Sequence, residues 1–172
     1  GGMGEVWAAW HKGLKREVAL KILRAASSDG AQRFDREVQA MTELTHPHTV
    51  RVFDYGSTDD GILYYAMELL RGENLTALVL REGALAPSRA VYFVTQAARA
   101  LAEAHRRGMV HRDVKPDNLF VTQAGDEGDY LKVLDFGIVK RSEEPGAASL
   151  TQTGAIAGTP AYIAPEVVRG ET

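Results

Sequence analysis

The sequence lacks cysteine altogether in its 172 residues. Without cysteine a chain has no disulfide framework, no thiolate zinc site and no thiol chemistry. Apolar runs approaching the ~20 residues that cross a bilayer are also missing, and the chain begins without a signal peptide. We therefore expect an intracellular, cytoplasmic domain with no membrane contact from this segment, whatever the full-length protein carries elsewhere.

An excess of positive charge is missing too. The formal net charge is −3, with 20 Lys and Arg residues against 23 Asp and Glu residues, and the basic residues are scattered along the chain. Nucleic-acid binding usually needs a basic stripe or face, so we expect no nucleic-acid partner. With 45% hydrophobic and 25% charged residues, the composition is that of a globular domain long enough to bury a core.

The order of the expected elements predicts an α+β fold with two lobes. The first lobe is a small antiparallel sheet with one helix, and the second is mainly helical and divides from the first near residues 70 and 71. Apolar runs indicate strands at 5–10, 17–23, 49–55, 62–69, 119–122 and 131–134. Apolar residues at helical spacing indicate helices at 30–44, 74–81 and 87–107, the last capped by Gly108. Residues 141–158 read as a long loop.

The chain opens on GGMGEV, residues 1–6, which we place at a turn between strands. Glycines there allow backbone amides to close over a polyphosphate, and Val6 can pack on a purine. Taken alone, a plain glycine-rich turn is an equally good interpretation.

A lysine ends the expected strand VALK, residues 18–21. An ammonium on a buried strand needs an anionic partner, and Glu37 on the helix at 30–44 is the candidate. Such a pair can hold the α- and β-phosphates of a nucleotide. The alternative is that Lys21 and Glu37 are two ordinary solvated charges.

The segment HRDVKPDN, residues 111–118, follows the long helix and is a loop, because Pro116 interrupts helical geometry. Phosphoryl transfer to a hydroxyl needs a carboxylate for the proton, a cation near the transferred group and an oxygen ligand for a hard metal. Asp113, Lys115 and Asn118 supply one of each. A charged, solvated loop is the competing interpretation.

Two further motifs follow in order. Asp135 stands at the end of the expected strand 131–134, before Phe136 and Gly137, where it can bind Mg²⁺ at the phosphates. The run GTPAYIAPE, residues 158–166, closes the long loop, and its two prolines and its aromatic residue suggest a rigid platform.

Together these motifs resemble the catalytic domain of eukaryotic-type serine/threonine protein kinases, and GGMGEVW at 1–7 is similar to the bacterial branch. The resemblance covers the whole chain. It implies transfer of the γ-phosphoryl group of ATP, with Mg²⁺, to Ser and Thr hydroxyls of protein substrates. The family's first strand and first glycine would precede residue 1, and its last helices would follow residue 172. We therefore interpret the chain as part of a kinase domain and expect the isolated segment to fold poorly and to be inactive.

The resemblance implies a role for each matching position. Those implied to bind ATP are Gly1, Gly2, Gly4, Val6, Ala19, Lys21, Met67, Glu68, Leu70 and Phe120. Those implied to be catalytic are the base Asp113, the γ-phosphate cation Lys115, and the pair Lys21 and Glu37. The implied Mg²⁺ ligands are Asn118 and Asp135. Met41, Val52, His111 and Phe136 match the family's internal hydrophobic spine.

Regulation is also implied. Arg112 directly precedes the base and can pair with a phosphate, and Thr151 and Thr153 match positions that bacterial relatives phosphorylate in trans, which involves self-association. The main alternative to an active enzyme is a nucleotide-binding pseudokinase, which predicts the loss of a catalytic residue, and none is lost. A small-molecule kinase of related fold fits less well, because the segment ending at 164–166 suits a docked polypeptide.

Overall fold

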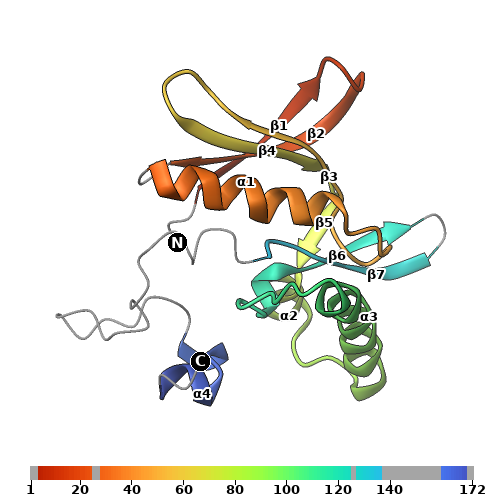
Figure 1. Ribbon diagram of the computed structural model, residues 1–172. Helices are drawn as coiled ribbons and strands as arrows, with labels where there is room; N and C mark the ends of the chain where they lie inside the picture. The colour runs from red at the N-terminus through yellow and green to blue at the C-terminus, as the bar shows by residue number, and fades with distance from the viewer. Residues whose placement is uncertain (1–3, 25–27, 125–126, 137–159, 170–172) are drawn as a thin grey trace.

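A four-stranded antiparallel sheet forms the first lobe, at the top of Figure 1. The computed structural model describes residues 4–24, 28–124, 127–136 and 160–169. The strands are β1 (Glu5–His11), β2 (Arg16–Arg24), β3 (Val52–Ser57) and β4 (Ile62–Glu68), in the order β1-β2-β4-β3. All were predicted, although β3 begins at Val52 rather than at 49. The residues before it are instead held by the second lobe.

One helix, α1 (Ser28–Thr42), packs against this sheet (Figure 1). Its buried side carries Phe34, Val38 and Met41, which recur at helical spacing and are each no more than 2% exposed. Each such side chain contributes about 1.5–3 kcal/mol through burial. The helix lies two residues earlier than predicted, and its core face is the one that the periodicity indicated.

The second lobe contains a three-stranded sheet and two principal helices. The sheet has the order β5-β6-β7, with β5 (Gly72–Asn74), β6 (Leu119–Ala124) and β7 (Glu127–Val133). The helices are α2 (Leu75–Glu82) and α3 (Pro87–Arg106). Gly108, predicted to cap α3, adopts φ +74° one residue beyond the cap Arg107. Strand β5 was not predicted.

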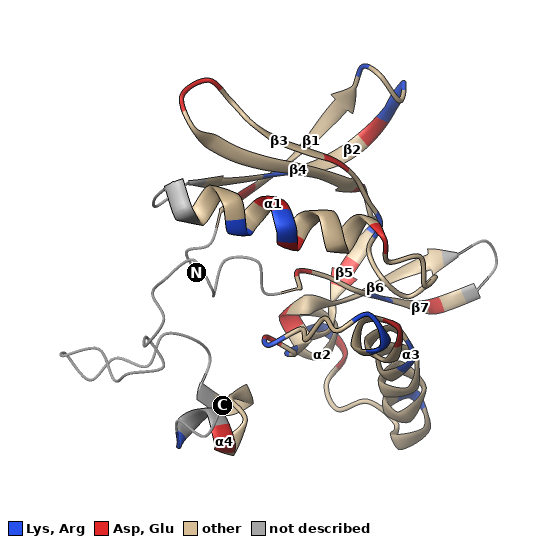
Figure 2. Ribbon diagram, viewed as in Figure 1, with Lys and Arg blue, Asp and Glu red and all other residues tan. Residues whose placement is uncertain are grey.

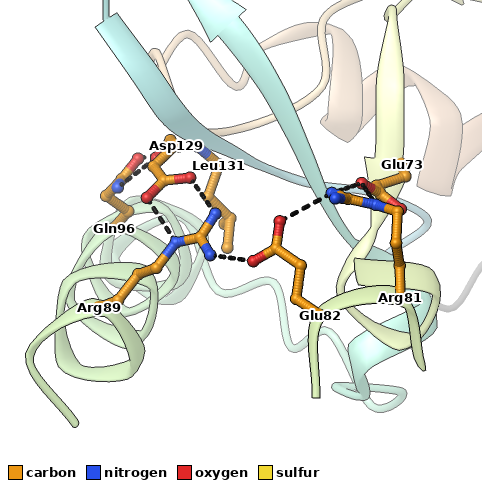
Figure 3. Close-up of polar contacts among 7 residues, drawn as sticks. All are labelled: Glu73, Arg81, Glu82, Arg89, Gln96, Asp129 and Leu131. Carbon is orange, nitrogen blue, oxygen red and sulfur yellow. Dashed lines mark hydrogen bonds and ion pairs between the residues drawn. The ribbon is translucent and has the colours of Figure 1, made fainter. Parts of the chain in front are cut away.

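An ion-pair network ties the elements of the second lobe together (Figure 3). The Arg89 guanidinium at the start of α3 donates two hydrogen bonds of 2.7 Å to the Asp129 carboxylate on β7, and it also pairs with Glu82 at the end of α2. Gln96 on α3 donates to the backbone oxygen of Asp129 and accepts from the backbone N–H of Leu131. The β6–β7 hairpin is therefore fixed on α3.

The loop that follows α1 joins the two lobes. The backbone N–H of Val133 donates to His48 O at 2.8 Å, and the N–H of Val50 donates to Val133 O at 3.0 Å. On the other side, Glu103 of α3 accepts from the backbone N–H groups of Thr45 and His46 at 3.2 and 2.9 Å. The loop after α1 is thus fixed to both β7 and α3.

Near its end the chain forms two short helical turns, η2 (Pro160–Tyr162) and α4 (Pro165–Val168). The turn η2 lies within the platform predicted at 158–166, and α4 begins within it and extends two residues beyond, while the predicted loop at 141–158 lies outside the described residues. Among the helices of the described ranges, none has the length and apolarity needed to cross a membrane. Acidic and basic positions are interspersed over both lobes (Figure 2).

Candidate active site

The predicted carboxylate, cation and amide of the loop 111–118 come together in the structure. Asp113 Oδ2 lies 3.1 Å from Lys115 Nζ and accepts a hydrogen bond of 3.1 Å from Asn118 Nδ2. The same Nδ2 donates to the backbone oxygen of Asp113 at 2.7 Å. Local geometry explains the cluster, because η1 (Pro116–Asn118) turns the chain back after Lys115 and Arg112 reverses it with φ +61°.

The buried His111 links this loop to the end of β7. Its Nε2 lies 2.8 Å from Leu134 O, and its Nδ1 accepts the backbone N–H of Asp113 at 3.3 Å. Both contacts are satisfied by the neutral ring with its proton on Nε2. Burial lowers the pKa of His111 against the opposing effects of the Leu134 carbonyl and of Asp113, so the neutral form is favoured.

Leu134 is hydrogen-bonded to the loop 111–118 through both its backbone oxygen and its backbone N–H. Its oxygen is the one that His111 contacts, and its N–H donates to Asn118 O at 2.9 Å. The residue next to Leu134 is Asp135. The two predicted metal ligands, Asn118 and Asp135, are therefore held in one hydrogen-bonded unit.

The Asp135 carboxylate contacts two side chains of the first lobe. Oδ2 lies 2.7 Å from Lys21 Nζ, and Oδ1 accepts a hydrogen bond of 2.7 Å from the hydroxyl of Tyr65. Lys21 on β2 and Tyr65 on β4 are direct cross-strand partners, so the sheet presents both donors from one face. Burial, and then the charge of Asp135, raises the pKa of Tyr65 well above 10, so the phenol stays protonated and donates.

Tyr65 was not predicted as a site residue. Its alternation with Leu63 and Met67 places it on the core face of β4, where all three are buried, and that pattern is typical of ordinary packing. In the structure, the carboxylate that pairs with Lys21 is that of Asp135. The predicted pair of Lys21 with Glu37, which lies in α1, stays a prediction.

Glu103 is a second residue that sequence reasoning missed. Burial, the largest single effect, would raise the pKa of its carboxyl, but the hydrogen bonds from His46 and Thr45 and the charge of Arg107 together lower it. A charged carboxylate therefore holds the loop after α1. A lone Glu in a helix gives no sequence signal of such a role.

Most of the residues implied to bind a nucleotide base lie on strands of the two sheets. Ala19 and Met67 are buried cross-strand partners on β2 and β4, Val6 is 56% exposed on β1, and Phe120 lies on β6. Leu70 lies half-buried in the connection 69–71 between the lobes. The Glu68 side chain pairs with Lys132 at 2.6 Å and accepts the Arg51 N–H at 2.8 Å. Any contact of Glu68 with a base would involve its backbone.

Gly4 stands where β1 begins and has φ +130°. A Cβ at this position would overlap the backbone oxygen of Ile22 on β2, so the close approach of the two strands requires glycine. Gly1 and Gly2 lie outside the described residues, as do Gly137, Thr151 and Thr153. Arg112 is described and exposed.

The oxygen donors fit a hard divalent cation. Because the amide nitrogen of Asn118 is used by Asp113, its carbonyl oxygen is the atom left for a cation. Asp135 adds two carboxylate oxygens, and Mg²⁺ in nucleotide sites is commonly held by one or two such side chains together with phosphates. Asn118 and Asp135 are therefore suited to Mg²⁺.

Comparison with known proteins gives consistent matches over the whole chain. The family described as the protein kinase domain matches residues 1–172. Serine/threonine-protein kinase pkn3 of Myxococcus xanthus is 42% identical over 175 residues, which cover 99% of this chain and 32% of the relative. PknD of Mycobacterium tuberculosis is 42% identical over 174 residues, which cover 99% of this chain and 25% of the relative.

A solved structure, the crystal structure of Rad53 in complex with AMP-PNP, superposes with a TM-score of 0.78 at 29% identity and covers 99% of this chain and 40% of that one. The chain thus spans about a third or less of the length of the two bacterial relatives.

Proposed function

This chain belongs to the protein kinase domain family, and we propose that its full-length protein transfers the γ-phosphoryl group of ATP to Ser and Thr hydroxyls of protein substrates. The observation that supports this most is the cluster of Asp113, Lys115 and Asn118, with the two charged groups 3.1 Å apart. The bacterial relatives are named serine/threonine-protein kinases, and the similar Rad53 was crystallised with the nucleotide AMP-PNP.

Each residue of the cluster has a step in the proposed reaction. The substrate hydroxyl oxygen attacks the γ-phosphorus, the bond from that phosphorus to the β–γ bridging oxygen breaks, and ADP leaves. The hydroxyl proton passes to Asp113, whose carboxylate is oriented by Lys115 and Asn118. The Lys115 ammonium stabilises the negative charge on the phosphoryl group during its transfer.

Lys21 and the two oxygen ligands complete the arrangement. We assign Lys21 to the α- and β-phosphates, because its ammonium is 2.7 Å from Asp135 and therefore faces the site. Asn118 and Asp135 would hold Mg²⁺, which when bound neutralises phosphate charge.

The test is transfer of labelled γ-phosphate from Mg-ATP to the full-length protein itself and to a generic protein substrate. Asp113→Asn is expected to lower the rate by about 10²–10⁴-fold, the usual contribution of a general base. Asp117→Asn is the matched control, because this exposed carboxyl lies in the same loop, and it should leave the rate close to wild type. Label on Ser or Thr that is lost only with Asp113 supports the proposal.

Binding of the nucleotide without any transfer would instead favour the pseudokinase. That outcome would leave the fold and the nucleotide site in place but remove the proposed chemistry.

Regulation by phosphorylation is proposed from the sequence resemblance. We propose that Arg112, which is exposed and next to Asp113, pairs with a phosphate on Thr151 or Thr153 that is transferred between two associated copies. Replacing both threonines by Ala should lower the activity of the full-length protein, and unchanged turnover after complete dephosphorylation would exclude this regulation. The cytoplasmic location also stays a prediction.

A further inference from the structure

A buried tyrosine hydroxyl touches the predicted metal ligand. Tyr65 is 1% exposed, and its hydroxyl donates to Asp135 Oδ1 at 2.7 Å, while Lys21 Nζ lies at 2.7 Å from Oδ2. Each carboxylate oxygen therefore has its own donor. Both donors come from neighbouring strands of one sheet, where Lys21 and Tyr65 are cross-strand partners and Nζ lies 5.8 Å from the Tyr65 ring centroid.

Packing alone does not require a hydroxyl at this position. The Tyr65 ring lies among apolar side chains, with the Phe34 ring centroid at 6.5 Å, and phenylalanine would supply the same contacts. A hydroxyl in such surroundings is stable only when it is hydrogen-bonded, and here the acceptor is an ionised group, which makes the bond a strong one.

The two hydrogen-bond donors restrict rotation of the Asp135 carboxylate. The terminal torsion of an Asp side chain is broad, so the carboxylate would otherwise rotate. The backbone of Asp135 is also in an unfavourable region, at φ +48°, and such a conformation persists only when surrounding contacts hold it. Lys21 and Tyr65 supply these contacts from the other lobe.

We propose that Tyr65 is a positioning residue for Asp135, whose hydroxyl holds the carboxylate in the orientation that binds Mg²⁺ with the nucleotide. The inference rests on the proposed function, because it assigns Asp135 to the metal. Hydrogen bonds to a ligating carboxylate commonly change metal affinity by about 10–100-fold. Loss of the hydroxyl is therefore expected to act on Mg²⁺ far more than on the nucleotide alone.

The experiment compares Tyr65→Phe with Tyr64→Phe in the full-length protein. Tyr64 is the adjacent residue of β4, and its hydroxyl is directed at Gly56 rather than at Asp135, so its removal is a matched control. ATP binding is measured by calorimetry with a chelator and then across a Mg²⁺ series. Tyr65→Phe should bind Mg-free ATP within about twofold of wild type, but need about tenfold more Mg²⁺ for half of the metal-dependent gain in affinity.

Turnover gives a second readout. Tyr65→Phe should approach the wild-type kcat at saturating Mg²⁺, whereas a variant with a merely loosened core would stay impaired at every Mg²⁺ concentration. Tyr64→Phe should match wild type throughout. If thermal melting shows that Tyr65→Phe is unfolded, Tyr65→Met, which fills similar space without a hydroxyl, takes its place.

The outcomes separate the two proposals. Wild-type protein without any Mg²⁺-dependent ATP binding would count against the proposed function itself. If the wild-type protein shows such binding and Tyr65→Phe has the same Mg²⁺ dependence, the inference about Tyr65 is overturned and the proposed function is not. Tighter Mg²⁺ binding in Tyr65→Phe would also overturn it, because the hydroxyl would then compete with the metal.

Discussion

The ammonium of Lys21 and the carboxylate of Asp135 form an ion pair between the two lobes, with Nζ 2.7 Å from Oδ2. Lys21 is 8% exposed, so removal of one partner leaves the other poorly solvated. We expect a double-mutant cycle of Lys21→Met and Asp135→Asn to give a coupling of about 1–2 kcal/mol in the free energy of unfolding, a value reduced by the partial exposure of Asp135.

The measurement is urea unfolding of wild type, both single variants and the double variant. Lys12→Met, at an exposed position in the turn between β1 and β2, should show no coupling with Asp135→Asn. A coupling near zero for Lys21 would mean that the pair adds nothing to stability.

Burial of His111 makes stability depend on pH near neutrality. Its pKa is lowered in the folded protein from an ordinary value of 6.5, so below about pH 6.5 the unfolded chain binds the proton first. Stability should therefore fall as the pH drops from 6.5 towards the folded-state pKa. Urea midpoints between pH 8 and 5 measure the slope.

The variant that isolates this effect is His111→Gln, which should have a shallower slope than wild type. His46 also has a lowered pKa, caused first by burial and then by His48, so part of the slope should persist, and His46→Gln should remove that part. Equal slopes for wild type and His111→Gln would contradict the prediction.

The ion pair of Arg89 and Asp129 should stabilise the fold at neutral pH and should lose this effect in acid. Arg89→Gln removes two charge-assisted hydrogen bonds to Asp129 and is expected to cost about 1–2 kcal/mol, allowing for partial exposure. The hydrogen bonds from Arg89 lower the pKa of Asp129. The contribution of the Asp129 carboxylate to the free energy of unfolding is therefore present above about pH 3.9, and it is lost as the pH falls through the folded-state pKa of this group.

The difference between wild type and Arg89→Gln should accordingly shrink below about pH 4. Chemical unfolding at pH 7 and at pH 3.5 tests this, with Arg99→Gln, an exposed position on the same helix, as the control that should cost little at either pH. A constant difference at both pH values would mean that the pair is not the cause.

Gly4 should tolerate no side chain. Gly4→Ala combines φ +130° with an overlap of Cβ and the Ile22 oxygen, and it is expected to cost about 1–3 kcal/mol and to weaken ATP binding. Gly13→Ala is the control, since a Cβ there comes no closer than 3.4 Å to the His11 ring. Thermal melting and calorimetry with ATP provide the measurements, and equal behaviour of the two variants would show that the strand junction adapts.

The parts of the site that were predictable are those where few residues separate the partners. Asp113, Lys115 and Asn118 lie within one loop, and the proline that ends helical geometry also directs the turn that brings them together. The strands and helices of the first lobe were predictable for a related reason. Their apolar periodicity depends on neighbours within a few positions of the chain.

What was missed depends on distant partners. Tyr65 and Asp135 are 70 positions apart, and Thr45 and Glu103 are 58 apart. Strand β5 has three residues and no alternation, and it is a strand only because β6 pairs with it. In the sequence alone, a tyrosine in an apolar strand is typical of the core and a glutamate in a helix is typical of the surface. Their hydrogen-bond partners come close only in the folded protein.

The Glu103 contacts give α1 a pivot. The loop just beyond the helix is held through Thr45 and His46, so rotation of α1 against the sheet would be a swing about its final turn. In a swing of this kind, displacement grows with the distance from the pivot. A rotation that barely moves Met41 would therefore carry Phe34, nearly two turns farther along the helix, out of its contacts with the Tyr55 and Tyr65 rings.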